Sequence, residues 1–215
     1  MTLDARTPLR EEIVNALTHG FGAVMSVGAG AVLITLAALH GDAFSVVGAS
    51  VFVGSLVLLY TASTLYHAIP WAAAKARLKV FDHCAIYVLI AGTYTPFLIG
   101  AMRGGWGWAL FGTIWGLAAA GVVFKLFFTG RFKLVSTLVY VAMGWLIVVA
   151  VGPMKASLAA PAIAWLVAGG VAYTAGTVFY LSKRIPFAHA IWHLFVLAGS
   201  VCHFAAVLVE VLRVA

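Results

Sequence analysis

Charged side chains are scarce in this chain, and acidic ones are scarcer than basic ones. Of the 215 residues, 9% are Asp, Glu, Lys or Arg and 64% are hydrophobic, with 13 basic and 6 acidic side chains. Soluble domains carry about 25% charged residues. The composition therefore excludes an ordinary soluble domain and predicts an integral membrane protein.

The apolar stretches are long and seldom interrupted. Runs without Asp, Glu, Lys or Arg cover residues 13–41, 43–74, 83–102, 104–124, 134–154, 156–182 and 185–209. Each run reaches the roughly 20 residues that a spanning helix needs. A transmembrane β-barrel would show short alternating segments instead, and only helices or closed barrels satisfy the backbone inside a bilayer. We therefore expect an all-α integral membrane protein, a bundle of seven transmembrane helices that forms a single domain over residues 1–215.

The basic residues are distributed unevenly between the two ends of the expected helices. With seven spans, ten Lys and Arg side chains fall on the side of the N-terminus and three on the other side. Because cytoplasmic loops are enriched in Lys and Arg, the N-terminus is expected in the cytoplasm and the C-terminus outside, in a multi-pass protein of the plasma or inner membrane. The formal charge of +7 then reflects topology or attraction to the membrane surface, and no nucleic-acid partner is expected.

Cysteine is rare, and the N-terminal segment is not typical of a secretory signal. Residues 1–12, MTLDARTPLREE, contain acidic residues and lead into a long apolar run, so we expect a short cytoplasmic segment. Cys84 and Cys202 fall in different runs at different depths, whereas a disulfide needs Cα atoms within about 7 Å. Both are expected to be small buried apolar groups.

The last apolar run contains three histidines. His189 and His193 are four residues apart, about 40° around a helix axis, so they face the same way. Pro186 suits a first helical turn and would place the pair at the beginning of the final helix. Such a pair can chelate one metal ion, as in the zinc-binding helix of metalloproteases, or can be two satisfied polar groups at a helix end. His203 lies about 15 Å beyond His193 along the helix and is expected to form buried hydrogen bonds or part of a polar path.

Two other expected helices carry polar residues at the same cytoplasmic end. Ser63 and His67 share a helix face because they are four residues apart. Asp82 and His83 follow the basic segment 75–79, and adjacent residues point about 100° apart, so at most one of them should face the bundle centre. We choose Asp82, because a buried carboxylate needs a cation or several donors, although it could instead cap a helix N-terminus.

A polar stripe precedes the first apolar run. Glu11 or Glu12 with Asn15 and His19 repeats at intervals of three and four residues. This stripe could lie on the lipid headgroups as an amphipathic turn, or it could pack beneath a site at the inner end of the bundle.

The direction of the chain brings these polar groups to one leaflet. The second expected helix ends inside, and the third and seventh begin inside. The groups that should lie at similar depth are His67, Asp82, His189 and His193. Three histidines with an open fourth position are typical of a catalytic zinc site, whose bound water loses a proton near neutral pH. Asp82 would hold or deprotonate that water, and Ser63 would orient a ligand or donate to a developing oxyanion. Imidazole suits zinc best among the common metals, and iron, cobalt or nickel also accept it.

The combined motifs resemble those of the hemolysin III group within the progestin and adipoQ receptor family. The matching elements are Ser63-x-x-x-His67, Asp82, His189-x-x-x-His193 and Glu12-x-x-Asn15-x-x-Thr18-His19. The resemblance covers essentially the whole chain and implies a seven-helix bundle with an inner zinc. The implied zinc ligands are His67, His189 and His193, and Asp82 would contact a zinc-bound water. The wider superfamily includes alkaline ceramidases, which implies hydrolysis of a lipid amide, whereas the bacterial branch is named for haemolysis and is associated with membrane homeostasis.

Several functions are compatible with these features. The first is a metal-dependent hydrolase of a lipid amide or ester that reaches the site sideways from the bilayer. The second is a sensor or homeostasis factor in which zinc holds helices together. The third is a pore-forming cytolysin, which the lack of a polar row along the spans disfavours. A bis-histidine haem would leave the close pair of His189 and His193 unexplained.

Overall fold

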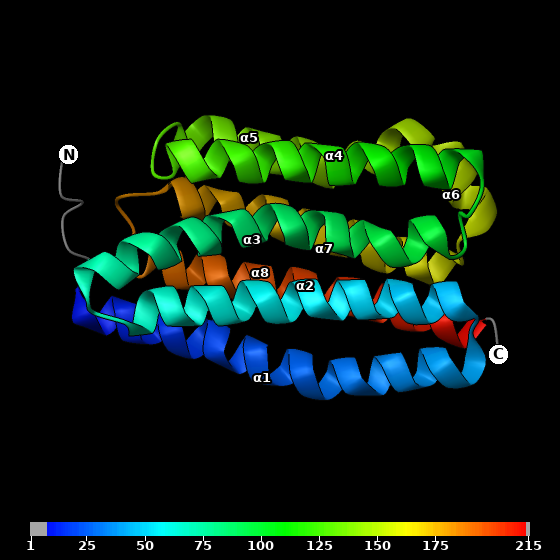
Figure 1. The fold of residues 1–215 in the computed structure, drawn as a ribbon, viewed down its shortest axis with the longest axis horizontal. Helices are drawn as coiled ribbons and strands as arrows, with labels where there is room; N and C mark the ends of the chain where they lie inside the picture. Colours follow the sequence, from blue (N-terminus) through cyan, green and yellow to red (C-terminus); the bar gives the residue numbers. More distant parts are fainter. Residues whose placement is uncertain (1–7, 214–215) are drawn as a thin grey trace.

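A computed structural model describes residues 8–213, most of which are helical (Figure 1). The long helices are α1 (Leu9–His40), α2 (Ala43–Ala68), α3 (Ala72–Ile99), α4 (Gly105–Phe128), α7 (Ala160–Leu181) and α8 (Ala188–Arg213). Between α4 and α7 the chain forms α5 (Lys133–Gly144), the 3-10 helix η1 (Leu146–Ala150) and α6 (Val151–Ser157). The connections between helices are short.

Within residues 8–213, six helical segments are long and apolar enough to cross a membrane. They are α1, α2, α4, α7, α8 and the combined segment Lys133–Ser157. α3 has 28 residues but is not among the six, and its first half carries Lys75, Arg77, Lys79 and Asp82. The expectation of an all-helical membrane protein is confirmed, while the seventh span stays a prediction.

The helices lie side by side along one axis, as Figure 1 shows. Helices α1 to α4 pack on one another in chain order, α7 packs on α8, and α8 returns to lie against α1. The start of α1, the connection between α2 and α3, and the start of α8 lie at the same end of the bundle (Figure 1). This arrangement places the polar ends of α1, α2, α3 and α8 close to one another, as the sequence predicts.

The inward face of α1 is a stripe of polar and small residues. Its buried residues recur at intervals of three or four: Asn15, His19, Gly22, Ser26, Gly30, Leu33 and Ala37. That interval is one face of an α-helix, and small residues on it let the neighbouring helices approach closely. A Cβ added to Gly22 would lie 2.8 Å from Leu197 and 2.9 Å from Tyr60. The polar stripe therefore packs inside the bundle, and its interpretation as an amphipathic turn on the headgroups is wrong.

The membrane segment after α4 is interrupted near its middle. α5 ends at Gly144, and η1 then leads into α6. The Tyr94 hydroxyl donates to the carbonyl oxygens of Met143 at 2.9 Å and Gly144 at 2.8 Å, and it accepts the Ile147 N–H at 3.1 Å. Unsatisfied backbone groups are costly in a membrane, so Tyr94 stabilises the interruption.

At the end of the bundle far from the start of α1, Asp42 caps α2. Its Oδ1 accepts the Ser45 N–H at 2.9 Å, and its Oδ2 accepts from Nη1 of Arg103 at 3.0 Å. The backbone hydrogen bond from Ser45, supported by Arg103, lowers the pKa of Asp42 below its usual 3.8. Asp42 thus ties the connection between α1 and α2 to the connection between α3 and α4.

Candidate metal centre

Three histidines converge at the end of the bundle where α1 and α8 begin. His67 lies in the last turn of α2, and His189 and His193 lie in the first two turns of α8. One ring nitrogen from each lies within 4.8 Å of the others, so the three could hold a metal ion. The ring centroids are 5.1 Å apart for His67 and His189, 5.2 Å for His67 and His193, and 4.6 Å for His189 and His193. The structure thus brings together the three residues that the sequence predicted as ligands.

The hydrogen bonds of two of these histidines leave one ring nitrogen available to a metal. Nδ1 of His67 donates to Oε2 of Glu12 at 2.7 Å, and its Nε2 is buried without a partner among residues 8–213. Nδ1 of His193 lies 3.2 Å from the carbonyl oxygen of Asn15 and 3.1 Å from Oγ1 of Thr18. An imidazole that donates from one nitrogen presents a lone pair at the other, which is the tautomer found in metal ligands. These side chains therefore fit a metal ion.

Asp82 of α3 and Ser63 of α2 border the same cavity as His189 and His193. Asp82 is 8% exposed, and its Oδ2 lies 3.4 Å from Nδ1 of His83. Within the described chain, Asp82 is outside the group of ligand atoms close enough to share one ion. Oγ of Ser63 is buried and has no hydrogen-bond partner in residues 8–213. Both residues lie where the sequence analysis expected them, and their catalytic roles stay predictions.

One alternative and two local expectations are wrong. Asp82 does not cap a helix, because α3 begins at Ala72, well before it. His83 lines the cavity together with Asp82, because the cavity follows a stripe two residues wide along α3 that continues through residues 89–90 and 93–94. The final helix begins at Ala188, so Pro186 precedes it and does not occupy its first turn.

The polar stripe of α1 contacts two of the three candidate ligands, His67 and His193. Glu12 bonds to His67, the Asn15 backbone bonds to His193, and the His19 ring stacks on His193 with centroids 3.5 Å apart. Both ring nitrogens of His19 and Oδ1 of Asn15 are buried without a partner in the described chain. The three- and four-residue spacing of this stripe predicts a single helix face but does not say whether that face packs beneath a site or lies on the headgroups. The residues of α1 complete the surroundings of the three histidines.

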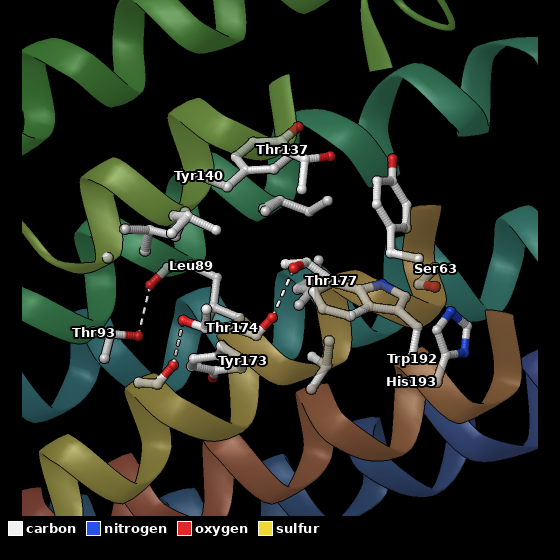
Figure 2. Close-up of a pocket in the computed structure, with 18 of the residues that line it drawn as sticks. Ser63, Leu89, Thr93, Thr137, Tyr140, Tyr173, Thr174, Thr177, Trp192 and His193 are labelled. Carbon is white, nitrogen blue, oxygen red and sulfur yellow. Dashed lines mark hydrogen bonds between the residues drawn. The ribbon is translucent and has the colours of Figure 1, made fainter. Parts of the chain in front are cut away.

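A cavity of about 120 Å³ extends from the histidines into the bundle. Figure 2 shows Ser63, Trp192 and His193 on one side of it and Tyr173, Thr174 and Thr93 further along. Most of the wall consists of apolar and aromatic side chains from α2, α3, α5, α7 and α8, and polar side chains lie both at the histidine end and further along, as at Thr93, Thr174 and His203.

His203 also borders the cavity, away from the three candidate ligands. Its Nδ1 donates to the Gly199 carbonyl oxygen at 2.7 Å, and its ring stacks on Tyr173 with centroids 5.2 Å apart. The expectation that His203 forms a buried hydrogen bond is therefore confirmed. His40 is exposed near the opposite end of the bundle.

Comparisons with known proteins identify the family. The family model described as Haemolysin-III related matches residues 8–204. The chain belongs to the haemolysin-III related family. This family member is 50% identical to the Hemolysin-3 homolog of Bacillus subtilis (strain 168) over 206 residues, which cover 96% of this chain and 97% of the relative. It is 49% identical to Hemolysin-3 of Bacillus cereus over 207 residues, covering 96% and 94% of the two chains.

A human relative is more distant. The monocyte to macrophage differentiation factor of Homo sapiens is 31% identical over 209 residues, which cover 92% of this haemolysin-III related chain and 83% of the human protein. The predicted resemblance to the hemolysin III group is thereby confirmed. Family membership and six apolar helices support a multi-pass membrane protein, which in bacteria is a protein of the cell membrane.

Proposed function

We propose that this haemolysin-III related protein is a zinc-dependent hydrolase of a lipid amide or ester that acts in membrane homeostasis. The observation that carries the proposal is that three imidazoles converge beside a largely apolar cavity, which two of them, His189 and His193, line. Three histidines with room for a further ligand are typical of catalytic zinc sites, and an apolar cavity suits an acyl chain. The substrate would be a membrane lipid that reaches the cavity sideways from the bilayer.

The proposed zinc ligands are His67, His189 and His193. Neutral imidazole is a good zinc ligand, and Nε2 of His67 is a buried nitrogen without a partner among residues 8–213. Zinc held in this way supplies Lewis acidity, which lowers the pKa of water toward neutrality.

Two residues of the cavity wall have proposed catalytic roles. Asp82 would orient the attacking water and accept its proton, since it borders the cavity beside the histidines without belonging to their ligand group. Ser63 would donate its hydroxyl to the oxygen of the substrate carbonyl as negative charge develops there, because its Oγ has no other partner in the described chain.

The proposed topology has seven spans, with α3 as the seventh, the N-terminus in the cytoplasm and the C-terminus outside. α3 is 28 residues long and lies alongside its neighbours (Figure 1). The start of α1 and the end of α8 lie at opposite ends of the bundle, as an odd number of spans requires (Figure 1). With the basic residues concentrated at the end where α1 begins, the histidines would lie near the cytoplasmic surface.

Elemental analysis of the purified protein tests the proposed metal centre, and an assay of lipid hydrolysis tests the proposed enzymatic activity. We expect about one zinc per chain in the wild type, less in His193→Ala, and an unchanged content in the control His40→Ala. Asp82→Ala should abolish hydrolysis of ceramides or other acyl amides and esters while the protein remains folded. Zinc-loaded wild type that hydrolyses none of these lipids would contradict the enzymatic proposal.

A second candidate function is a non-enzymatic sensor or homeostasis factor with structural zinc. It is favoured by the position of the three histidines, which join the end of α2 to the start of α8. In that case His67→Ala should lower thermal stability sharply, and Asp82→Ala should leave the cellular function intact. The name Hemolysin-3 of the Bacillus cereus relative suggests a pore-forming cytolysin, but the apolar wall of the cavity argues against an aqueous pore.

A further inference from the structure

Glu12 of α1 is shared between a candidate metal ligand and a positive side chain. Its Oε2 lies 2.7 Å from Nδ1 of His67 and 3.2 Å from Nζ of Lys75. The side chains of His67, Glu12 and Lys75 are only 5%, 16% and 26% exposed, so little water competes for the carboxylate. The charged form of a carboxylate that is largely shielded from water is stabilised by such donors, here His67 and Lys75.

Lys75 is held in place by the end of α2. Its Nζ donates to the carbonyl oxygen of Tyr66 at 3.0 Å and lies 5.0 Å from the centroid of the Tyr66 ring. Tyr66 directly precedes His67, so Lys75 is anchored beside the same turn that carries the candidate ligand. The ammonium group therefore stays close enough to compete with His67 for one carboxylate oxygen.

We propose that Glu12 is a positioning residue of the metal centre and that Lys75 restrains it, so that the two residues shift the affinity for a divalent cation in opposite directions. The inference rests on the proposed metal centre at His67, His189 and His193. A carboxylate behind a metal-binding imidazole fixes the tautomer and orientation of the ring and strengthens its electron donation. Lys75 shares that carboxylate and adds a positive charge that repels a cation.

Opposite changes of metal affinity in the Glu12 and Lys75 variants would distinguish this role from a purely structural one. Glu12→Gln removes the negative charge behind His67 and should weaken metal affinity by about 10- to 100-fold. Lys75→Met removes the competing donor and its charge, and it should tighten affinity by roughly 3- to 10-fold. If the two side chains only supported the fold, both substitutions would weaken metal binding and lower stability together.

Two control variants remove the same charges from the same helices. Glu11→Gln is matched to Glu12→Gln, because within residues 8–213 the Glu11 side chain accepts one hydrogen bond, from the backbone N–H of Phe187 at 3.3 Å. Arg77→Met is matched to Lys75→Met, because Arg77 is exposed on the same first part of α3. Neither control should change metal affinity more than about twofold if local geometry, and not net charge, sets the affinity.

The experiment is a chelator-competition titration of the full-length purified protein with Zn²⁺ and Co²⁺, with the visible absorption of bound Co²⁺ as a second readout. We expect weaker binding and an altered Co²⁺ spectrum in Glu12→Gln, partial recovery in Glu12→Asp, and tighter binding in Lys75→Met. Shifts of the same sign in the Glu12→Gln and Lys75→Met variants, or no shift in either, would overturn the inference while leaving the metal centre intact. If Glu12→Gln does not fold, the pair of Glu12→Asp and Lys75→Met decides by the same opposite signs. Wild type that binds neither ion would overturn the inference and the proposed metal centre together.

Discussion

The imidazole of His19 lies flat against that of His193, with centroids 3.5 Å apart and 10° between the ring planes. Nδ1 of His193 has hydrogen-bonding partners on α1, whereas both nitrogens of His19 are buried without any in the described chain. A fourth imidazole therefore lies against the candidate metal centre, and its ring nitrogens have no partner in residues 8–213. Such atoms reduce stability and are typical of functional surroundings.

Replacing His19 should not destabilise the metal-free protein. A buried polar group without a partner costs about 1–3 kcal/mol, so His19→Leu should be at least as stable as the wild type in detergent. The matched variant is Ser200→Ala, because Oγ of Ser200 bonds to the hydroxyls of Tyr60 at 2.7 Å and Tyr173 at 2.9 Å. Ser200→Ala should lose about 1–2 kcal/mol. Equal losses in the two variants, measured by thermal unfolding, would contradict the assignment of His19 as unsatisfied.

Metal removal should lower the unfolding temperature, because an ion that binds only the folded state stabilises it. Free metal at 100 times its dissociation constant contributes about 2.7 kcal/mol. Chelation should therefore destabilise the wild type and the control His40→Ala but leave His67→Ala unchanged. A chelator effect that persists in His67→Ala would indicate that the metal binds elsewhere.

Loss of the Tyr94 hydroxyl should destabilise the interrupted segment between α5 and η1. Tyr94→Phe leaves the carbonyl groups of Met143 and Gly144 and the N–H of Ile147 without this partner, at a cost of about 1–3 kcal/mol. Thr113→Val is the control, since among the described residues the Thr113 hydroxyl bonds only to the carbonyl oxygen of Ala109 in its own helix, at 2.8 Å. Thermal unfolding should separate the two variants, and similar behaviour would mean that the interruption is satisfied in another way.

The close approach of α2 to α3 should make one glycine of α2 irreplaceable. A Cβ at Gly48 would lie 2.8 Å from Cα of Pro96. Because a backbone atom cannot move away by a change of rotamer, Gly48→Ala should lower the free energy of unfolding by about 1–3 kcal/mol. A Cβ at Gly54 of the same helix would meet nothing within 4 Å, and alanine there should gain about 0.5–1 kcal/mol from helix propensity. Unfolding measurements in which the two alanine variants behave alike would contradict the packing of α2 on α3.

Much of this arrangement could be predicted from helical periodicity and from the direction of successive spans. His189 and His193, and likewise Ser63 and His67, share a face because each pair is four residues apart. Alternating spans then bring the end of the second helix and the start of the last to one end of the bundle, which is where the structure has them. These inferences need only local geometry and the bilayer, so composition and spacing were enough.

The sequence alone determined a helical membrane protein and the three histidines that could share a metal. Only the tertiary structure decided that Glu12 bonds to His67, that His19 stacks on His193, and that Tyr94 satisfies the break after α5. It also decided that His83 borders the cavity together with Asp82. The physical reason is that spacing specifies which residues share a face of one helix, whereas the rotation and contact of two helices depend on how small and large side chains interlock between them.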